Sequence, residues 1–494
     1  MKKISCILVL FSAVFVHAQV ESLAGHNYFR DQYQKPGFKI EAFPSHLPKD
    51  STKVSFRDKL KKHFMDAYLF EVHEKNVNLY LSPVVNFQAG QDWLDEGGPT
   101  LYQNTRGIYV KGTLLKNLSF ATTFVENQAR FSKYENNFIS SHGEFYPNAS
   151  TVQQNGVVSG GGRTKPFKEG GYDYGYAIGS FLYKPIENLE IRAGNAPTFV
   201  GSGYRSLILS DNSYQAPSID IKYNFLKKWS YGVHRTRRFN LIRKTAFSTV
   251  EGYYQPKASS RHYLNYQVNQ NITVGLSENS IWSMGDSVTT KPSSLYYAPM
   301  PFFGLTQSTN HTIYGFDASE VAGKKTKFYQ QFVFSGLDVS QMGFQLGVRF
   351  YDLLPNSMLQ LEYNKVGSEL YTADAPNMSY THYNLPLAHP KGQGFDELVI
   401  RANVSIKRVY GESKTVCYWL KNYNERDLLP MDNESPAIDD LIIHQQFELG
   451  YRINPKINFC LFGRAVLRIS DIDPTQILLH IGLSTNLFNN YNDY

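Results

Sequence analysis

The chain has 494 residues and a formal net charge of +7, which is spread too thinly over this length to indicate a nucleic-acid partner. Beyond the N-terminus no run approaches the ~18 apolar residues of a membrane-spanning helix, so the sequence excludes a helical membrane protein. Tyrosine and phenylalanine are abundant, with 35 and 33 copies against 4 tryptophans. Tyrosine suits a membrane–water boundary, because its ring is apolar and its hydroxyl group stays hydrated.

Residues 1–18 have the features of a secretory signal peptide. They begin with basic residues, continue with an apolar run and end in Val16-His17-Ala18, a small-residue cleavage site. We therefore expect export and cleavage near Ala18-Gln19. The exported chain would retain Cys417 and Cys460, and the sequence leaves open whether these two cysteines pair.

Residues 19–76 differ in character from the rest of the chain. They are polar and contain several prolines, and apolar residues recur at helical spacing from Phe56 to Glu74. This spacing predicts one amphipathic helix. We interpret the segment as a short periplasmic lead-in, and it either partly plugs the domain that follows or packs on its rim.

Residues 77–494 form a string of strand candidates with alternating apolar and polar residues. In the last candidate, Ile477 to Phe488, one parity is apolar and the other mostly polar, which predicts a ribbon with two unlike faces. About ten tilted residues are enough for a strand to cross a bilayer, whereas strands of soluble domains usually have about five or six. A large soluble sandwich also alternates, so alternation alone does not separate the two folds.

The connections between these strands separate the two folds better, because short and long ones alternate. Short connections such as Lys184–Glu187 and Gly323–Lys325 are rich in turn-forming residues. The long ones fall at about 128–173, 196–216, 237–259, 281–311, 367–396 and 421–440. Outer-membrane barrels have short periplasmic turns and longer outer loops. The sequence therefore predicts an all-β fold, a transmembrane antiparallel β-barrel of about 18 strands over 77–494, with both chain ends in the periplasm.

Neither a catalytic constellation nor a metal-binding spacing stands out, so we expect no enzyme, no metal and no cofactor. The polar faces of the predicted strands carry charges of both signs. A lumen filled with both signs can be closed to solutes by arginine–carboxylate hydrogen bonds. The residues concerned are Glu190, Arg192, Asp220, Lys222, Glu362, Arg401, Glu448, Arg452 and Arg464.

The longest predicted loop, 128–173, contains a glycine-rich basic stretch with Arg163, Lys165 and Lys168. Such a stretch is able to wrap a phosphate or an acidic sugar. The alternative is a flexible solvated loop, which the sequence favours.

Gly194–Ser213, GNAPTFVGSGYRSLILSDNS, resembles a signature of the capsule assembly Wzi family. Gly162–Lys168 and Thr485–Asn489 resemble the RemB-like branch of that family, found in gliding Bacteroidota, and the likeness runs from about Val77 to the end. The resemblance implies an 18-stranded outer-membrane barrel with a helical periplasmic lead. It implies a lectin role that holds capsule polysaccharide in Wzi-like members, and a part in gliding in RemB-like members. The short lead of this chain departs from the capsule branch.

Within that signature, Tyr204 and Arg205 lie beside glycines and are suited to stacking on, and hydrogen bonding to, a sugar or a neighbouring chain. Asp211 follows in the same stretch. The alternative is that the segment folds into the lumen, where Arg205 pairs with Asp211 or with another carboxylate. The sequence does not choose between these two placements.

Two classes of function follow from these patterns. The first is a non-enzymatic surface protein of gliding motility or polysaccharide attachment, in contact with outer-membrane lipid and with surface polysaccharide or proteins of the gliding or secretion machinery. The second is a passive porin or solute transporter. A porin needs an open, water-filled lumen, whereas the lumen of an interaction protein is expected to be crowded.

Overall fold

In the computed structural model, the lumen of a β-barrel is filled by loops of the same chain. The predicted signal peptide and most of the predicted lead-in lie outside the residues that the structure describes. The described residues are 30–32, 34–36, 65–115, 117–146, 149–243, 254–284, 292–298, 300–301, 310–424, 427–429, 436–485, 489 and 491–494.

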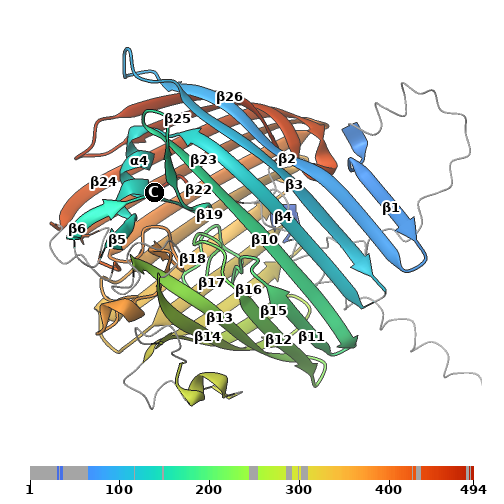
Figure 1. Cartoon of the computed structure of the whole chain (residues 1–494). Helices are drawn as coiled ribbons and strands as arrows, with labels where there is room; N and C mark the ends of the chain where they lie inside the picture. The colour runs from blue at the N-terminus through green and yellow to red at the C-terminus, as the bar shows by residue number, and fades with distance from the viewer. Residues whose placement is uncertain are drawn as a thin grey trace, which may run out of the picture.

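Eighteen antiparallel strands close into one barrel (Figure 1), which confirms the predicted fold class. Closure is direct, because β26 pairs with β2 along Asn86–Asp92. No helix among the described residues is long and apolar enough to span a membrane. The wall strands are β2 (Val77–Asp92), β3 (Leu101–Leu114), β4 (Leu118–Arg130), β10 (Gly171–Ile186), β11 (Leu189–Gly194), β12 (Ser218–Phe225), β13 (Trp229–Arg243), β14 (Tyr254–Gln267), β15 (Ile272–Ser283), β16 (Asn310–Ala322), β17 (Thr326–Phe334), β18 (Met342–Tyr351), β19 (Ser357–Val366), β22 (Phe395–Ile406), β23 (Val409–Tyr423), β24 (Ile438–Asn454), β25 (Phe459–Ile469) and β26 (Gln476–Thr485).

The remaining elements are short and lie before the wall or in its connections. The largest is the helix α4 in the β4–β10 connection, which starts with a capping box formed by Ser132 and Glu135. The bounds are β1 (Phe70–Glu74), α4 (Lys133–Ser141), β5 (Glu144–Tyr146), β6 (Ala149–Gln154), β7 (Val157–Val158), β8 (Gly162–Arg163), β9 (Lys165–Phe167), η2 (Ser294–Tyr297), η4 (Val339–Gln341), η5 (Pro376–Met378), β20 (Thr381–His382), β21 (Leu385–Pro386) and η6 (Pro455–Ile457).

The exposure of side chains along β26 agrees with the two faces predicted from the sequence. Leu479 and Ile481 point outward and are 41% and 65% exposed, whereas Leu478 and Ser484 point inward and are buried. Each wall strand sends alternate side chains to opposite faces, so the apolar parity forms the outer surface and the polar parity lines the lumen.

The connections at one end of the barrel are short, such as 187–188 and 407–408, and most at the other end are longer, such as 131–170 and 367–394. We therefore assign the short-turn end to the periplasm. The predicted loop 237–259 is too long, since β13 extends to Arg243 and β14 begins at Tyr254. These strand ends carry polar inward residues, which resemble loop composition.

The predicted helix over Phe56–Glu74 is wrong at its C-terminal end, because Phe70–Glu74 form the strand β1, and its first part, 56–64, lies outside the described residues. β1 pairs with Val77–Leu81 of β2, a part of β2 that β26 does not reach. An unpaired strand edge has backbone groups that need partners. β1 provides hydrogen-bond partners for these backbone groups of β2. The need to pair this edge outweighs the local preference for a helix that the spacing of apolar residues indicates.

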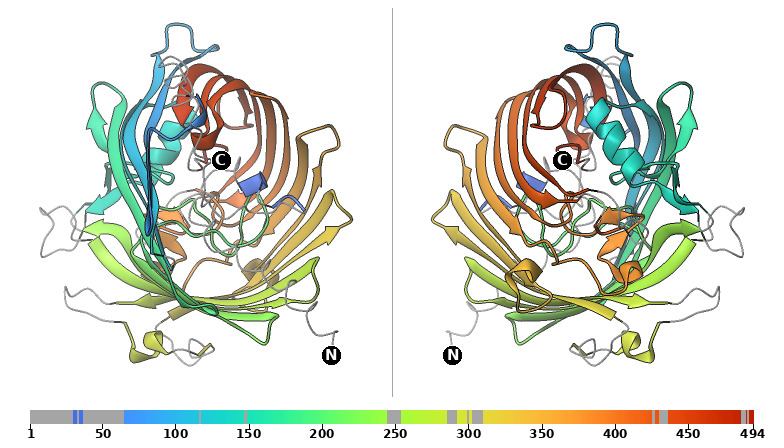
Figure 2. Two further views of the ribbon diagram at one scale, coloured as in Figure 1. Left: turned by 90° about the vertical axis from the view of Figure 1, so that its right-hand side faces the viewer. Right: turned by 90° about the vertical axis from the view of Figure 1, so that its left-hand side faces the viewer.

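We name the material inside the barrel the luminal plug. It comprises the described residues of 30–36 and 489–494, the β11–β12 loop 195–217 and the β19–β22 loop 367–394. Seen from either end of the barrel (Figure 2), these segments occupy the lumen, and the C-terminus lies inside it. The expectation that both chain ends lie in the periplasm is therefore wrong for the C-terminal residues.

Candidate functional site

The β11–β12 loop, which contains the family-like signature, turns into the lumen. Its apolar triplet Leu207-Ile208-Leu209 is buried in the main core cluster together with Ile281 and Ile313 of the wall. An apolar triplet in an outer loop of a barrel loses water contact most easily by folding inward. Burial of this triplet brings Tyr204 and Arg205 to the middle of the plug.

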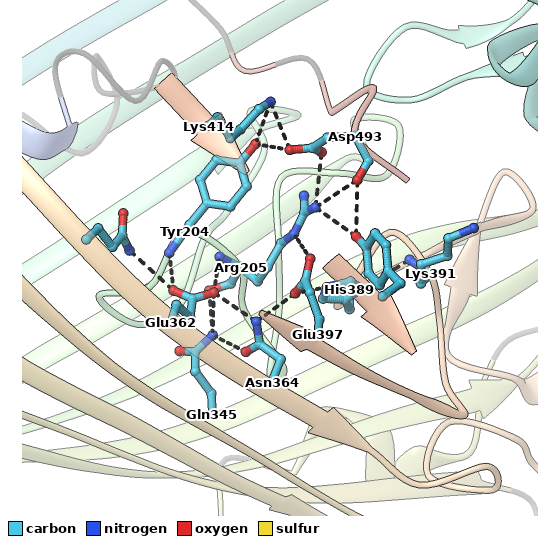
Figure 3. A network of polar contacts seen from close by, with 12 residues as sticks. Tyr204, Arg205, Gln345, Glu362, Asn364, His389, Lys391, Glu397, Lys414 and Asp493 are labelled. Atoms are coloured by element: carbon cyan, nitrogen blue, oxygen red, sulfur yellow. Dashed lines mark hydrogen bonds and ion pairs between the residues drawn. The ribbon is translucent and has the colours of Figure 1, made fainter. Parts of the chain in front are cut away.

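Arg205 is 1% exposed and is hydrogen bonded to three parts of the chain (Figure 3). Its Nε lies 3.0 Å from Oε1 of Glu397 on β22. Its Nη2 donates to the hydroxyl of Tyr418 on β23 at 2.8 Å and lies 3.0 Å from Oδ1 of Asp493. The side chain therefore links the loop to the wall and to the C-terminal segment.

Tyr204 lies beside Arg205 and is 2% exposed. Its hydroxyl donates to Oδ2 of Asp493 at 2.6 Å. Lys414 on β23 also contacts that oxygen, with its Nζ 2.9 Å away. The carboxylate of Asp493 thus accepts a hydrogen bond from a tyrosine and forms ion pairs with two cationic side chains. These partners all lie inside the barrel.

A second carboxylate, Glu362 on β19, holds the backbone of the same loop (Figure 3). It accepts the backbone N–H groups of Tyr204 at 2.6 Å and Arg205 at 3.0 Å. The hydroxyl of Tyr329 donates to it at 2.8 Å, and the amide of Asn364 donates to it at 3.0 Å. Because carboxylates accept such bonds strongly, Glu362 fixes the loop where it enters the network.

Opposite charges stabilise one another within this network. Burial raises the pKa of the Asp493 carboxyl, but the adjacent Arg205 and Lys414 outweigh burial and hold that pKa well below its ordinary value. Burial lowers the pKa of Arg205, and the nearby Asp493 and Glu397 outweigh it and raise that pKa. Both groups therefore stay charged over the physiological pH range. Their ion pair holds the β11–β12 loop to the C-terminal segment throughout that range.

The described N-terminal residues are held in the lumen by ion pairs. Asp31 lies 3.0 Å from Arg401 of β22 and 3.3 Å from Arg349 of β18. Lys35 lies 2.6 Å from Asp352 in the β18–β19 turn. The described residues of this segment therefore lie in the lumen next to the periplasmic turns.

Asp211 does not pair with Arg205. It accepts hydrogen bonds from the hydroxyl of Tyr491 at 2.7 Å and from the amide of Asn489 at 3.1 Å. Farther along, the ring of Tyr494 stacks on Phe138 of α4 with the centroids 3.7 Å apart. The C-terminal segment therefore ties the β11–β12 loop to the β4–β10 connection.

Arg163, Lys165 and Lys168 of the β4–β10 connection are separate from this network. Arg163 lies 3.1 Å from Glu144 of β5, a fully buried carboxylate that also contacts Arg243 of β13 at 3.2 Å. Lys165 and Lys168 are exposed, and Nζ of Lys168 lies 5.2 Å from the centroid of the Phe167 ring. Arg163 thus anchors the stretch that presents the two lysines outward.

The structure thus favours the luminal placement of Tyr204, Arg205 and Asp211 over a surface placement. Sequence reasoning named these three residues and placed Glu362 on the inner face of its strand, but it missed Asp493 and Glu397. For Glu397 the alternating pattern of β22, on which it shares the parity of Arg401, was a usable signal, whereas Asp493 lies in a short polar stretch with no pattern. Among the described residues, no group of three or more His, Cys, Asp or Glu side chains is placed to hold a metal ion.

A cavity of about 510 Å³ remains between the plug and the wall formed by β2–β4 and β22–β26. Its lining includes the amide side chains of Asn86, Gln88, Gln103, Asn403 and Gln446. Its lining extends from Lys407 and Pro455, in periplasmic turns, to Ser132 at the start of α4.

No known protein family matches the chain, and no curated protein matches it. Solved structures with a similar fold are found. Wzi, an outer-membrane protein involved in group 1 capsule assembly in Escherichia coli and a carbohydrate-binding β-barrel, is 12% identical, with a TM-score of 0.54 over 87% of this chain and 86% of that chain. OccD1 (OprD) is 8% identical, with a TM-score of 0.42 over 85% and 96% of the two chains. OccAB4 of Acinetobacter baumannii is 7% identical, with a TM-score of 0.42 over 83% and 98%. The chain therefore has a β-barrel fold similar to that of Wzi.

Proposed function

We propose that this protein is a non-enzymatic outer-membrane barrel that acts at the cell surface, in attachment of surface polysaccharide or in gliding motility. The observation that carries the proposal is the luminal plug. Segments from both ends of the chain and two outer loops meet inside the barrel and are joined by buried hydrogen bonds and ion pairs. A barrel closed by its own loops is suited to present a rigid outer surface and poorly suited to pass solutes.

The likeness of the fold to Wzi supports the polysaccharide alternative, since that protein binds carbohydrate. The tracts of the sequence that resemble RemB support the gliding alternative. In both cases the protein is exported after cleavage near Ala18-Gln19 and contacts outer-membrane lipid through the apolar outer face of the barrel. The partner is a surface polysaccharide or a protein of the gliding or secretion machinery.

The outer contact that we propose is the basic stretch of the β4–β10 connection. Lys165 and Lys168 are exposed there, while Arg163 and the buried Glu144 hold the stretch against the wall. A fixed pair of lysines is suited to acidic sugars. In this proposal Tyr204, Arg205 and Asp211 support the loops from inside and do not touch the ligand.

Passive solute transport is the second candidate, and the cavity of about 510 Å³ favours it. The two functions differ in conductance. Our proposal predicts that the purified barrel conducts poorly in a planar bilayer and that gene deletion alters colony spreading or polysaccharide retention while solute uptake stays normal.

The double variant Lys165→Ala/Lys168→Ala tests the contact itself. It should reproduce part of the deletion phenotype at unchanged barrel abundance. Its matched control is Lys227→Ala/Lys228→Ala, which removes two lysines from a turn at the periplasmic end. High single-channel conductance together with normal spreading and normal polysaccharide retention in the deletion strain would establish the transport function and refute ours.

A further inference from the structure

Arg235 and Arg237 of β13 point to the outer face of the barrel. His234 and Thr236, which alternate with them, line a small cavity beside Leu209 of the plug and therefore face the lumen. Successive side chains of a strand point to opposite faces, so the two arginines lie on the face that meets lipid. A charge on that face is unfavourable unless a partner compensates it.

The two arginines lie near the outer edge of the lipid-facing band. Arg235 pairs across the strands with Ile219 of β12, an apolar residue that is 42% exposed on the outer face. Arg237 is eight residues beyond Trp229, where β13 leaves the periplasmic turn. At a rise of about 3.4 Å per residue and a tilt of about 40°, Arg237 lies about 20 Å above that turn, in a band about 25 Å tall. This is close to the level of the head groups of the outer leaflet.

Neither arginine forms an ion pair with a carboxylate among the residues that the structure describes. Nη2 of Arg235 donates to the carbonyl of Ala298 at 2.7 Å and lies 2.9 Å from Nε2 of His262. Arg237 is exposed, and its guanidinium carbon lies 5.3 Å from the centroid of the Phe239 ring. Arg237 thus presents a cation on the outer face without a counter-charge in the described part of the chain.

The short helix η2 covers Arg235 from outside the wall. η2 lies outside the ring of wall strands in both views of Figure 2. The centroid of its Tyr296 ring is 5.4 Å from the guanidinium carbon of Arg235. Glu278, an acidic residue of the same patch, lies opposite His262 and is buried. η2 therefore fixes Arg235 beside the exposed Arg237, and the patch keeps an excess of positive charge.

We propose that Arg235 and Arg237 bind the phosphate monoester of an acylated sugar phosphate, a glycolipid of the lipid A type, in the outer leaflet. Guanidinium groups offer planar forks of donors that match phosphate oxygens. A phosphate monoester carries a charge of about −1.5 to −2 and three acceptor oxygens, enough for both arginines. The acyl chains then lie against the apolar residues below, which are Ile219, Ile221 and Val233. This site goes beyond the proposed function and does not depend on it.

The test uses the full chain in detergent and native mass spectrometry with diphosphoryl lipid A, phosphatidylglycerol and inorganic phosphate as probes. Arg237→Gln removes the exposed charge. Arg106→Gln is its matched control, because Arg106 is exposed on the outer face of β3, eight residues from Leu114 at the periplasmic end, and lies opposite Glu126 of β4. Heat-modifiable gel migration checks that both variants are folded. We expect lipid A to bind about tenfold more weakly to Arg237→Gln than to the wild type or to Arg106→Gln, which is about 1.4 kcal/mol.

Arg237→Lys keeps the charge but loses the planar fork, so it should bind lipid A with intermediate affinity. Phosphatidylglycerol has a phosphodiester with a single charge, and its binding should change less than that of lipid A in Arg237→Gln. Inorganic phosphate lacks acyl chains and should not displace lipid A.

Unchanged lipid A binding in Arg237→Gln would overturn the proposal, and an altered oligomeric state in the same variant would then make this face a protein contact. An equal loss of both lipids would show that the face takes any anionic lipid, which overturns the assignment to a phosphate monoester. Displacement of lipid A by inorganic phosphate would overturn the role of the apolar residues. None of these outcomes bears on the outer lysines, so the proposed function is tested separately.

Discussion

Oδ1 of Asp493 lies 3.0 Å from Nη2 of Arg205, although the two residues are 288 positions apart in the sequence. This ion pair joins the C-terminal segment to the β11–β12 loop, and Lys414 of the wall completes it. The contents of the lumen therefore behave as one unit that is fastened to the wall.

The variant Asp493→Asn should loosen that unit. It keeps the shape of the side chain but leaves Arg205 and Lys414 buried without this counter-charge. Removal of one partner from a buried ion pair costs on the order of 3–5 kcal/mol. We expect the barrel to assemble normally and its single-channel conductance to rise. Asp471→Asn, in the exposed tip of the β25–β26 hairpin, is the control and should change neither. Unaltered conductance in Asp493→Asn would contradict the role of this ion pair in closing the lumen.

Adjacent residues on β26 test which face meets lipid. Leu483→Arg places a charge on the outer face, where arginine near the bilayer midplane costs about 2–4 kcal/mol. Ser484→Arg places it on the inner face, at the edge of the polar cavity. Leu483→Arg should therefore reduce the yield of heat-modifiable barrel more than Ser484→Arg. Equal yields would count against the assigned faces, and the opposite order would reverse them.

Acid should release the β4–β10 connection from the wall. Burial raises the pKa of Glu144, but hydrogen bonds from Tyr254, Asn155 and Arg163 outweigh it, so the folded pKa lies below the ordinary value of 4.5. A lowered folded pKa stabilises the fold above the unfolded pKa, and that stability is lost as the pH falls through the folded pKa. Limited digestion with an acid-active protease should cut this connection only in strong acid. In Glu144→Gln the cutting should lose its dependence on pH; a wild-type-like pH profile there would rule Glu144 out as the titrating group.

The two cysteines should not form a disulfide. Cys417 lies on the outer parity of β23 beside the exposed Trp419, whereas Cys460 is fully buried on the inner parity of β25. Two thiols on opposite faces of a barrel wall do not meet without movement of the backbone. The purified protein should migrate identically in gels with and without reductant, and it should yield two thiols per chain after denaturation. A mobility shift on reduction would show that the two cysteines pair.

The wall was predictable from the sequence because each strand repeats one local rule, the alternation of apolar and polar residues. The rule failed at the end of β13, Arg237–Arg243, where the inward residues Arg238 and Asn240 are polar and resemble loop composition. It also failed for Phe70–Glu74, whose helical spacing gave way to the open edge of β2. In both places the deciding partner is distant in the sequence.

The plug was predictable only in part. The inward charges of Glu362, Arg401 and Glu448 follow from the strand pattern, and they do lie in the lumen. Their partners come from loops and from the chain ends, where no periodicity exists. For this reason the sequence left Arg205 with two equally weighted placements, and the structure favours the inner one.

The seam between β2 and β26 has a consequence for the order of assembly. β26 ends at Thr485 at the periplasmic end, and Tyr491–Tyr494 lie back inside the lumen, against α4 and the β11–β12 loop. Once β2 and β26 are paired, the wall surrounds these residues on every side. After the seam has formed, the C-terminal segment is able to reach its place only through an end of the barrel, so docking of this segment and pairing of the first and last wall strands are linked steps of biogenesis.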